Sequence, residues 1–110
     1  MRNYAEFEDR LHAACASRGV SRTAGFVDGR PVFHVSIHPD AAGPPALLIA
    51  GTHGDEPAGV EAALQFIERA SDAYPRVLFE ALPCTNPHGY VHATRENAAG
   101  IDLNWVYDRE

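Results

Sequence analysis

The sequence lacks any apolar segment long enough for a membrane span or an export signal. Its longest apolar run, residues 44–50, is far shorter than the roughly 20 residues that a membrane-spanning helix needs. The polar and acidic N-terminus, residues 1–10, contains no apolar stretch of signal-peptide length. We therefore expect no membrane partner and a cytoplasmic location.

Positive charge and cysteine are also scarce. Nine Lys and Arg residues are scattered along the chain and outnumbered by 15 Asp and Glu residues, which leaves a formal net charge of −6. Nucleic-acid binding needs clustered basic residues, so this composition argues against a nucleic-acid partner. In a chain without an export signal, the two cysteines, Cys15 and Cys84, are expected to be free thiols.

The first third of the sequence predicts a helix followed by a hairpin. Apolar residues recur at helical spacing over residues 3–18, and Gly19 is expected to end this helix in the left-handed conformation. Strands are predicted over residues 23–27 and 30–38, joined by the two-residue turn Asp28-Gly29. Alternating polar and apolar residues in the second strand predict one buried face and one wetter face.

The middle of the sequence predicts a strand, a helix and a second strand. Residues 46–50 are a short apolar run, which is typical of a parallel strand buried on both faces. A helix is predicted over residues 57–70, with Asp55 capping its start, and a strand over residues 76–82. Residues 83–89 are predicted to form a loop. The fold class expected for residues 1–110 is α/β, specifically half of an α/β/α sandwich with a mixed sheet.

The stretch Gly51-Thr52-His53-Gly54-Asp55-Glu56-Pro57 carries the clearest chemical signal. It follows a predicted buried strand, where α/β folds place their sites. Imidazole and carboxylate are ligands that zinc takes in hydrolytic sites, so His53 and Glu56 are candidate metal ligands. His-x-x-Glu alone is a weak signal, however. His53 in a turn is often a solvated residue, and Glu56 could simply favour the helix N-terminus.

Three later segments strengthen the metal interpretation: Asn86-Pro87-His88-Gly89-Tyr90, Thr94-Arg95-Glu96-Asn97 and Gly100-Ile101-Asp102-Leu103-Asn104. Together with the stretch around His53, they occur in the order of the zinc carboxypeptidase family. From about residue 35 to residue 104 the chain resembles that family and its aspartoacylase-like and succinylglutamate-desuccinylase-like relatives.

This resemblance implies a role for each matching residue. His53 and Glu56 correspond to the first two zinc ligands, and Asp102 to the carboxylate that hydrogen-bonds the ligand histidine. Arg95 corresponds to the arginine that polarises the scissile carbonyl and stabilises the oxyanion, and Asn104 to the asparagine that helps to hold the substrate carboxylate. Without the motif context, Arg95 would be interpreted as a surface ion pair, Asp102 as a turn residue and Asn104 as a loop residue.

The chain departs from the family pattern in two respects. Trp105 follows Asn104, where the family usually has an arginine, so bidentate capture of a peptide C-terminal carboxylate is lost at this position. Plain core or interface packing is an equally good interpretation of Trp105. The family's third zinc ligand and its general-base glutamate lie well downstream of Asn104. We expect His88 and His92 to be solvated rather than substitute ligands, because Pro87 and Gly89 argue against a helix there.

The sequence therefore predicts the N-terminal portion of a zinc-dependent hydrolase of amide bonds, acting on a small peptide or on an acylated amino acid. The alternative from another class is a non-catalytic binding module that kept the fold. For the chain alone we expect weak, partial zinc binding and negligible hydrolysis, since catalytic zinc sites normally have three protein ligands. An uncovered edge at residues 46–50 would also allow self-association.

Overall fold

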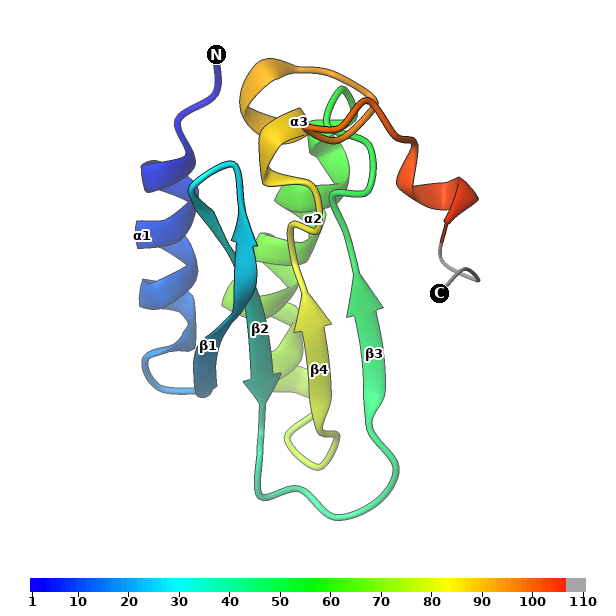
Figure 1. The fold of residues 1–110 in the computed structure, drawn as a ribbon. Helices are drawn as coiled ribbons and strands as arrows, with labels where there is room; N and C mark the ends of the chain where they lie inside the picture. Colours follow the sequence, from blue (N-terminus) through cyan, green and yellow to red (C-terminus); the bar gives the residue numbers. More distant parts are fainter. Residues whose placement is uncertain (107–110) are drawn as a thin grey trace.

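A four-stranded mixed sheet forms the centre of the fold (Figure 1). The structure is a computed structural model and describes residues 1–106. The strands are β1 (Gly19–Val27), β2 (Arg30–Ile37), β3 (Ala46–Ile49) and β4 (Phe79–Leu82), in the order β1-β2-β4-β3. β2 runs antiparallel to both β1 and β4, whereas β3 and β4 are parallel. The predicted α/β class and mixed sheet are confirmed.

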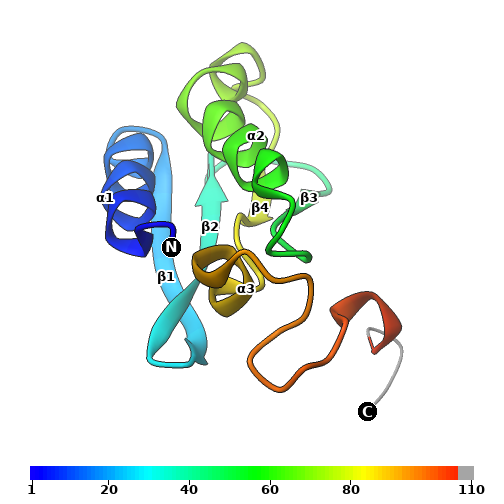
Figure 2. The ribbon, with the colours of Figure 1, turned by 90° about the horizontal axis from the view of Figure 1, so that it is seen from above.

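Two helices cover one face of this sheet. α1 (Tyr4–Cys15) and α2 (Pro57–Glu68) lie on the same side of the strands (Figure 2). Their apolar faces join Phe33, Val35 and Ile37 of β2 in one hydrophobic core. Within residues 1–106 no helix covers the opposite face, so the described chain supplies one helical layer of the expected sandwich.

The remaining elements are short. They are the 3-10 helices η1 (Ala70–Ala73) and η2 (Leu103–Trp105) and the α-helix α3 (Pro87–His92). None of the helices in residues 1–106 is long and apolar enough to cross a membrane. Cys15 and Cys84 are buried free thiols, as predicted.

The predicted hairpin is confirmed, whereas the predicted role of Gly19 is wrong. Asp28 and Gly29 have φ values of 53° and 72° between the paired residues Val27 and Arg30, as a two-residue turn of this kind requires. α1 ends at Cys15, earlier than expected, and Gly19 is the first residue of β1. A Cβ at Gly19 would lie 2.0 Å from the Ser36 carbonyl oxygen, so close strand pairing explains this glycine.

The prediction that residues 46–50 are buried on both faces is wrong. β3 is an edge strand, and the Leu47 and Ile49 side chains on its open face are 68% and 44% exposed. Leu48 points the other way and packs against the core. An apolar run alone could not distinguish a central strand from an edge strand, since burial depends on what lies over each face. The last strand is also shorter than predicted and begins at Phe79 rather than at residue 76.

Two predictions about helix starts are also wrong. Glu56, not Asp55, occupies the N-cap position of α2, and no side chain caps that helix. Residues 87–92 form α3 rather than part of a loop, although Pro87 and Gly89 are both inside it. Proline is tolerated in the first turn, where its missing N–H has no helical partner. The Asn86 side chain accepts a hydrogen bond from Gly89 N–H and so caps α3.

Candidate active site

The candidate site lies at the carboxyl ends of the parallel strands β3 and β4. In α/β folds, ligands bind at this edge because the loops that follow neighbouring parallel strands meet there. The chain bends sharply after β3 at Gly51, whose φ is 74°. Gly54 then approaches α3 so closely that a Cβ on it would lie 1.8 Å from the Gly89 carbonyl carbon. The two glycines therefore allow the turn that carries His53 to lie directly on α3.

The His53 imidazole lies between two carboxylates. Its Nδ1 atom is 2.9 Å from Glu56 Oε2, and its Nε2 atom is 2.9 Å from Asp102 Oδ1. The side chain of His53 is only 9% exposed and that of Asp102 14%, whereas that of Glu56 is 67% exposed. The ring is thus held from its inner side by Asp102 and faces Glu56 on the side that opens to solvent.

Asp102 connects the other predicted site residues to this ring. Its Oδ2 accepts a hydrogen bond from Arg95 Nε at 3.0 Å, and its Oδ1 accepts one from Asn104 N–H at 3.0 Å. The Asn104 side-chain nitrogen lies 3.5 Å from His53 Nε2. All five residues singled out in the sequence therefore lie in one cluster, although 51 residues separate its ends.

Hydrogen bonds in this cluster shift the pKa values of His53 and Asp102 in opposite directions. The hydrogen bond to Asp102 raises the pKa of His53, and Glu56 adds to this effect while the Arg95 charge opposes it. The hydrogen bond from His53 lowers the pKa of Asp102, with Asn104 N–H and Arg95 acting in the same direction. Asp102 is therefore held as a carboxylate that accepts hydrogen bonds.

The residues present fit two positions of a zinc site. A zinc-bound imidazole commonly donates its second N–H to a carboxylate, which is the arrangement of His53 with Asp102. Ligand atoms on a tetrahedral zinc ion lie about 3.3 Å apart, so the 2.9 Å between His53 Nδ1 and Glu56 Oε2 needs to widen by only a few tenths of an ångström. Within residues 1–106 no third His, Cys, Asp or Glu completes the set.

Asn86 holds the site together, although the sequence alone assigned it no such role. Asn86 is 1% exposed, and its side-chain nitrogen donates to the carbonyl oxygens of Thr52, Arg95 and Glu96 at 3.2, 3.4 and 3.1 Å. It thereby joins the turn before His53 to the segment that carries Arg95. The Asn-Pro pair at the start of a glycine-containing segment was the available signal, because asparagine before proline is a common N-cap.

Arg2 is a second positioning residue that the sequence did not reveal. Its Nη1 atom donates to the carbonyl oxygens of Gly54 and Tyr90 at 2.8 and 2.7 Å, and its guanidinium carbon lies 5.4 Å from the Tyr90 ring centroid. The N-terminus thus clamps the turn after His53 to α3. This contact spans 52 and 88 residues, so no local pattern could predict it.

A shallow open hollow of about 340 Å³ lies beside the cluster and is lined by His53, Glu56 and residues 49–52 and 59. A larger hollow of about 700 Å³ includes Gly19, His38 and Arg76, at the other end of the strands, and contains no residue of the cluster. Its size alone does not make it a site, because it brings together no comparable set of reactive groups.

The other candidates from the sequence lie elsewhere. Trp105 is 72% exposed, so it does not pack in the core of residues 1–106, whereas its packing at an interface stays a prediction. His88 bonds to Asp28 rather than to His53 or Glu56. The expectation that His88 is a solvated histidine is therefore wrong as well, since its ring has a carboxylate partner.

Comparisons with known proteins show what the chain is similar to. Residues 42–110 match the model of one family, the succinylglutamate desuccinylase/aspartoacylase catalytic domain. No curated protein matches the chain.

Solved structures extend the similarity to most of the chain. A protein from Shewanella amazonensis SB2B, described as a candidate metallopeptidase, is 27% identical with a TM-score of 0.81, covering 91% of this chain and 39% of its own. A second such protein, from Shewanella baltica OS155, is 33% identical with a TM-score of 0.76, covering 91% and 38%. A metallo-carboxypeptidase from Burkholderia cenocepacia is 25% identical with a TM-score of 0.70, covering 92% and 31%. The chain thus spans less than two fifths of each of these structures.

Proposed function

Because the chain belongs to the succinylglutamate desuccinylase/aspartoacylase catalytic-domain family, we propose that it forms part of a zinc-dependent hydrolase of amide bonds. The observation that carries this proposal is the His53 ring held between Asp102 and Glu56, each at 2.9 Å. A metal-binding histidine commonly donates its second ring N–H to a carboxylate, which fixes the orientation of the ring, whereas a solvated histidine in a turn requires no such partner.

His53 Nδ1 and one carboxylate oxygen of Glu56 would hold the zinc ion. When bound, zinc supplies a Lewis acid for the substrate carbonyl and lowers the pKa of a bound water. Asp102 fixes the tautomer of His53 by accepting the Nε2 proton, so that Nδ1 presents its lone pair. The lowered pKa of Asp102 favours this role, because a protonated carboxyl could not accept that proton.

Arg95 would stabilise the negative charge that develops on the substrate carbonyl oxygen. Its Nε atom is bonded to Asp102 at 3.0 Å, which leaves the two terminal nitrogens without a partner in residues 1–106. A cation that is oriented before the reaction stabilises the transition state without reorganising during it. The Asn104 amide, next to the ring of His53, would bind a carboxylate or carbonyl group of the substrate.

The proposed substrate is a small peptide, with an acylated amino acid as the second candidate. The similar structures described as metallopeptidases and as a metallo-carboxypeptidase support the first. The family match and Trp105, which takes the place of a carboxylate-binding arginine, support the second. Release of free amino acid from N-acyl amino acids and from short peptides, measured with the complete catalytic domain, distinguishes them.

We keep the prediction that residues 1–110 are the N-terminal part of a catalytic domain. A zinc hydrolase needs a third protein ligand and a general base, and within residues 1–106 no side chain is placed to supply the ligand. A non-catalytic module is the rival. Hydrolysis by the complete domain that is abolished by His53→Ala supports the enzyme, whereas a complete domain inactive on both substrate classes supports the module.

Zinc calorimetry tests the site in the chain itself. In a His88→Asn/His92→Asn background, which removes the other two histidines considered as ligands, we expect weak binding that is lost in His53→Ala and weakened about 10–100-fold in Asp102→Asn, as for other carboxylates behind a ligand histidine. Equal affinity in this background and in both variants made from it would refute the assignment. A cytoplasmic location and self-association through the exposed edge of β3 also remain predictions. Sedimentation of the parent and of Leu47→Lys tests the second, since a lysine on an edge strand opposes pairing.

A further inference from the structure

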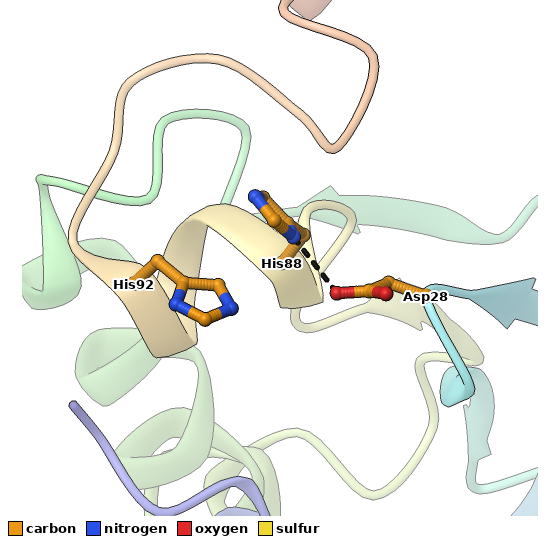
Figure 3. A group of neighbouring side chains, drawn as sticks. All are labelled: Asp28, His88 and His92. Atoms are coloured by element: carbon orange, nitrogen blue, oxygen red, sulfur yellow. Dashed lines mark hydrogen bonds and ion pairs between the residues drawn. The ribbon is translucent and has the colours of Figure 1, made fainter.

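A second group of metal-binding side chains lies on the other side of α3 from the turn that carries His53. It consists of Asp28, at the tip of the β1–β2 hairpin, with His88 and His92 of α3 (Figure 3). His88 Nδ1 lies 2.9 Å from Asp28 Oδ2, and the His88 and His92 ring centroids are 4.5 Å apart. One potential ligand atom from each residue lies within 4.8 Å of the other two.

Local structure brings these residues together. His88 and His92 are four positions apart on α3, so their side chains share one face of the helix. Asp28 and Gly29 both have the positive φ values that this two-residue turn needs, and Asp28 therefore lies at the tip of the hairpin. The tip is in turn held close to the helices, because the Tyr4 hydroxyl donates to the Pro31 carbonyl oxygen at 2.6 Å.

We propose that Asp28, His88 and His92 form a second site, which binds a divalent transition-metal ion such as Zn²⁺. Two imidazoles and one carboxylate select zinc, nickel or copper over magnesium or calcium, which prefer oxygen ligands. Two histidines at positions i and i+4 of a helix are a known chelating pair. Asp28 and His92 are exposed, so an ion can enter from solvent and keep water in its remaining positions.

A simpler interpretation explains only part of this group. The Asp28–His88 hydrogen bond could serve just to attach the hairpin tip to α3, and Arg30 Nη1 shares the same carboxylate oxygen at 2.9 Å. That interpretation leaves His92 unexplained, since its ring lies against His88 and makes no hydrogen bond in residues 1–106.

The site is independent of the proposed hydrolase site. In residues 1–106 none of its three side chains bonds to His53, Glu56 or Asp102. An ion here would join the hairpin to α3, segments 60 residues apart in the sequence. Binding to the folded state alone raises stability by mass action, so the ion would also stabilise the chain.

Calorimetry with Zn²⁺ tests the proposal on the 110-residue chain. The background is the double variant His53→Ala/Glu56→Ala, which removes the other candidate site. We expect one Zn²⁺ per chain, and we expect His92→Asn in this background to weaken the affinity by about tenfold or more, because losing even an outer partner of a ligand costs about 10–100-fold. His12→Asn, which changes an exposed histidine of α1, is the matched control and is expected to leave the Zn²⁺ affinity of the background unchanged.

Thermal unfolding supplies a second measurement that does not depend on the heat of binding. Zn²⁺ at 100 times its dissociation constant is expected to raise the Tm of the background by about 10 °C, and the same concentration is expected to raise the Tm of His92→Asn by about half as much or less. Because His92 is exposed, His92→Asn is expected to fold like the background in the absence of metal. No Zn²⁺ binding by the background, or equal binding by His92→Asn, would overturn the proposal. Full affinity in Asp28→Asn would overturn the three-residue site.

Discussion

Asn86→Ala is the substitution that best tests how the candidate active site is held together. The Asn86 side chain is buried, caps α3 through Gly89 N–H at 2.9 Å, and donates to three carbonyl oxygens from two other segments. Alanine removes all four hydrogen bonds and leaves the groups that made them without this partner. The substitution therefore removes the side-chain hydrogen bonds that join the turn carrying His53, helix α3 and the segment carrying Arg95.

The expected loss of unfolding free energy is about 3 kcal/mol. Loss of an N-cap asparagine alone costs about 1 kcal/mol. Each buried polar group left unsatisfied costs about 1–3 kcal/mol, but the bonds to the three carbonyls are long, at 3.1–3.4 Å, and water can replace some of them. We therefore add only about 2 kcal/mol for the three together. Against a total stability of about 5–15 kcal/mol, such a loss is large.

Urea unfolding followed by circular dichroism measures this difference. Asn3→Ala is the matched control, because Asn3 also caps a helix, α1, but accepts only from the N–H groups of Ala5 and Glu6. We expect that control to lose about 1 kcal/mol. If the two variants lose the same free energy within about 0.5 kcal/mol, the bonds from Asn86 to the other segments contribute nothing and the reasoning is refuted.

Four further predictions concern ionisable groups. Asp102→Asn is expected to lower the raised pKa of His53 in the metal-free chain, as followed by NMR titration; an unchanged pKa would contradict Asp102 as its main cause. Because the pKa of His53 is higher in the folded chain than in the unfolded chain, the contribution of His53 to stability is present at low pH. This contribution is lost as the pH rises through the pKa of the folded state. The pKa of Glu61 is lowered to about 2, first by its hydrogen bonds from Arg10, so stability is expected to fall as pH drops from about 4.5 to about 2, and less so in Glu61→Gln. Burial raises the pKa of the Cys84 thiol to about 12, so alkylation by iodoacetamide at pH 8 is expected to occur only when the chain unfolds; rapid alkylation of the folded chain would contradict its burial.

The candidate site residues were predictable because they occur in short motifs whose order along the chain matches that of a known family. His53 and Glu56 were recognisable as a pair from their spacing and from the strand before them, and Asp102, Arg95 and Asn104 from their segments. The structure brings all five together. The hairpin was predictable for a different reason, since Asp-Gly accepts the positive φ values that a two-residue turn imposes.

The sequence predictions were wrong where the same local pattern occurs in two different structural settings. Residues 46–50 have the composition of a central strand, but β3 lies at the edge with Leu47 and Ile49 exposed. Pro87 and Gly89 discourage a helix in general, but the Asn86 cap and the close approach of Gly54 favour α3 here. In both cases the neighbours, rather than the residues themselves, decide the outcome.

The sequence by itself determined the α/β class, the hairpin and the identity of the candidate site residues, because these depend on local periodicity, turn chemistry and motif order. Only the tertiary structure decided which nitrogen of His53 faces Asp102, that Asn86 and Arg2 hold the turn, and that Asp28 bonds to His88. Those contacts join residues 34 to 60 positions apart. Contacts at such separations arise from how strands and helices pack, which no short stretch of sequence records.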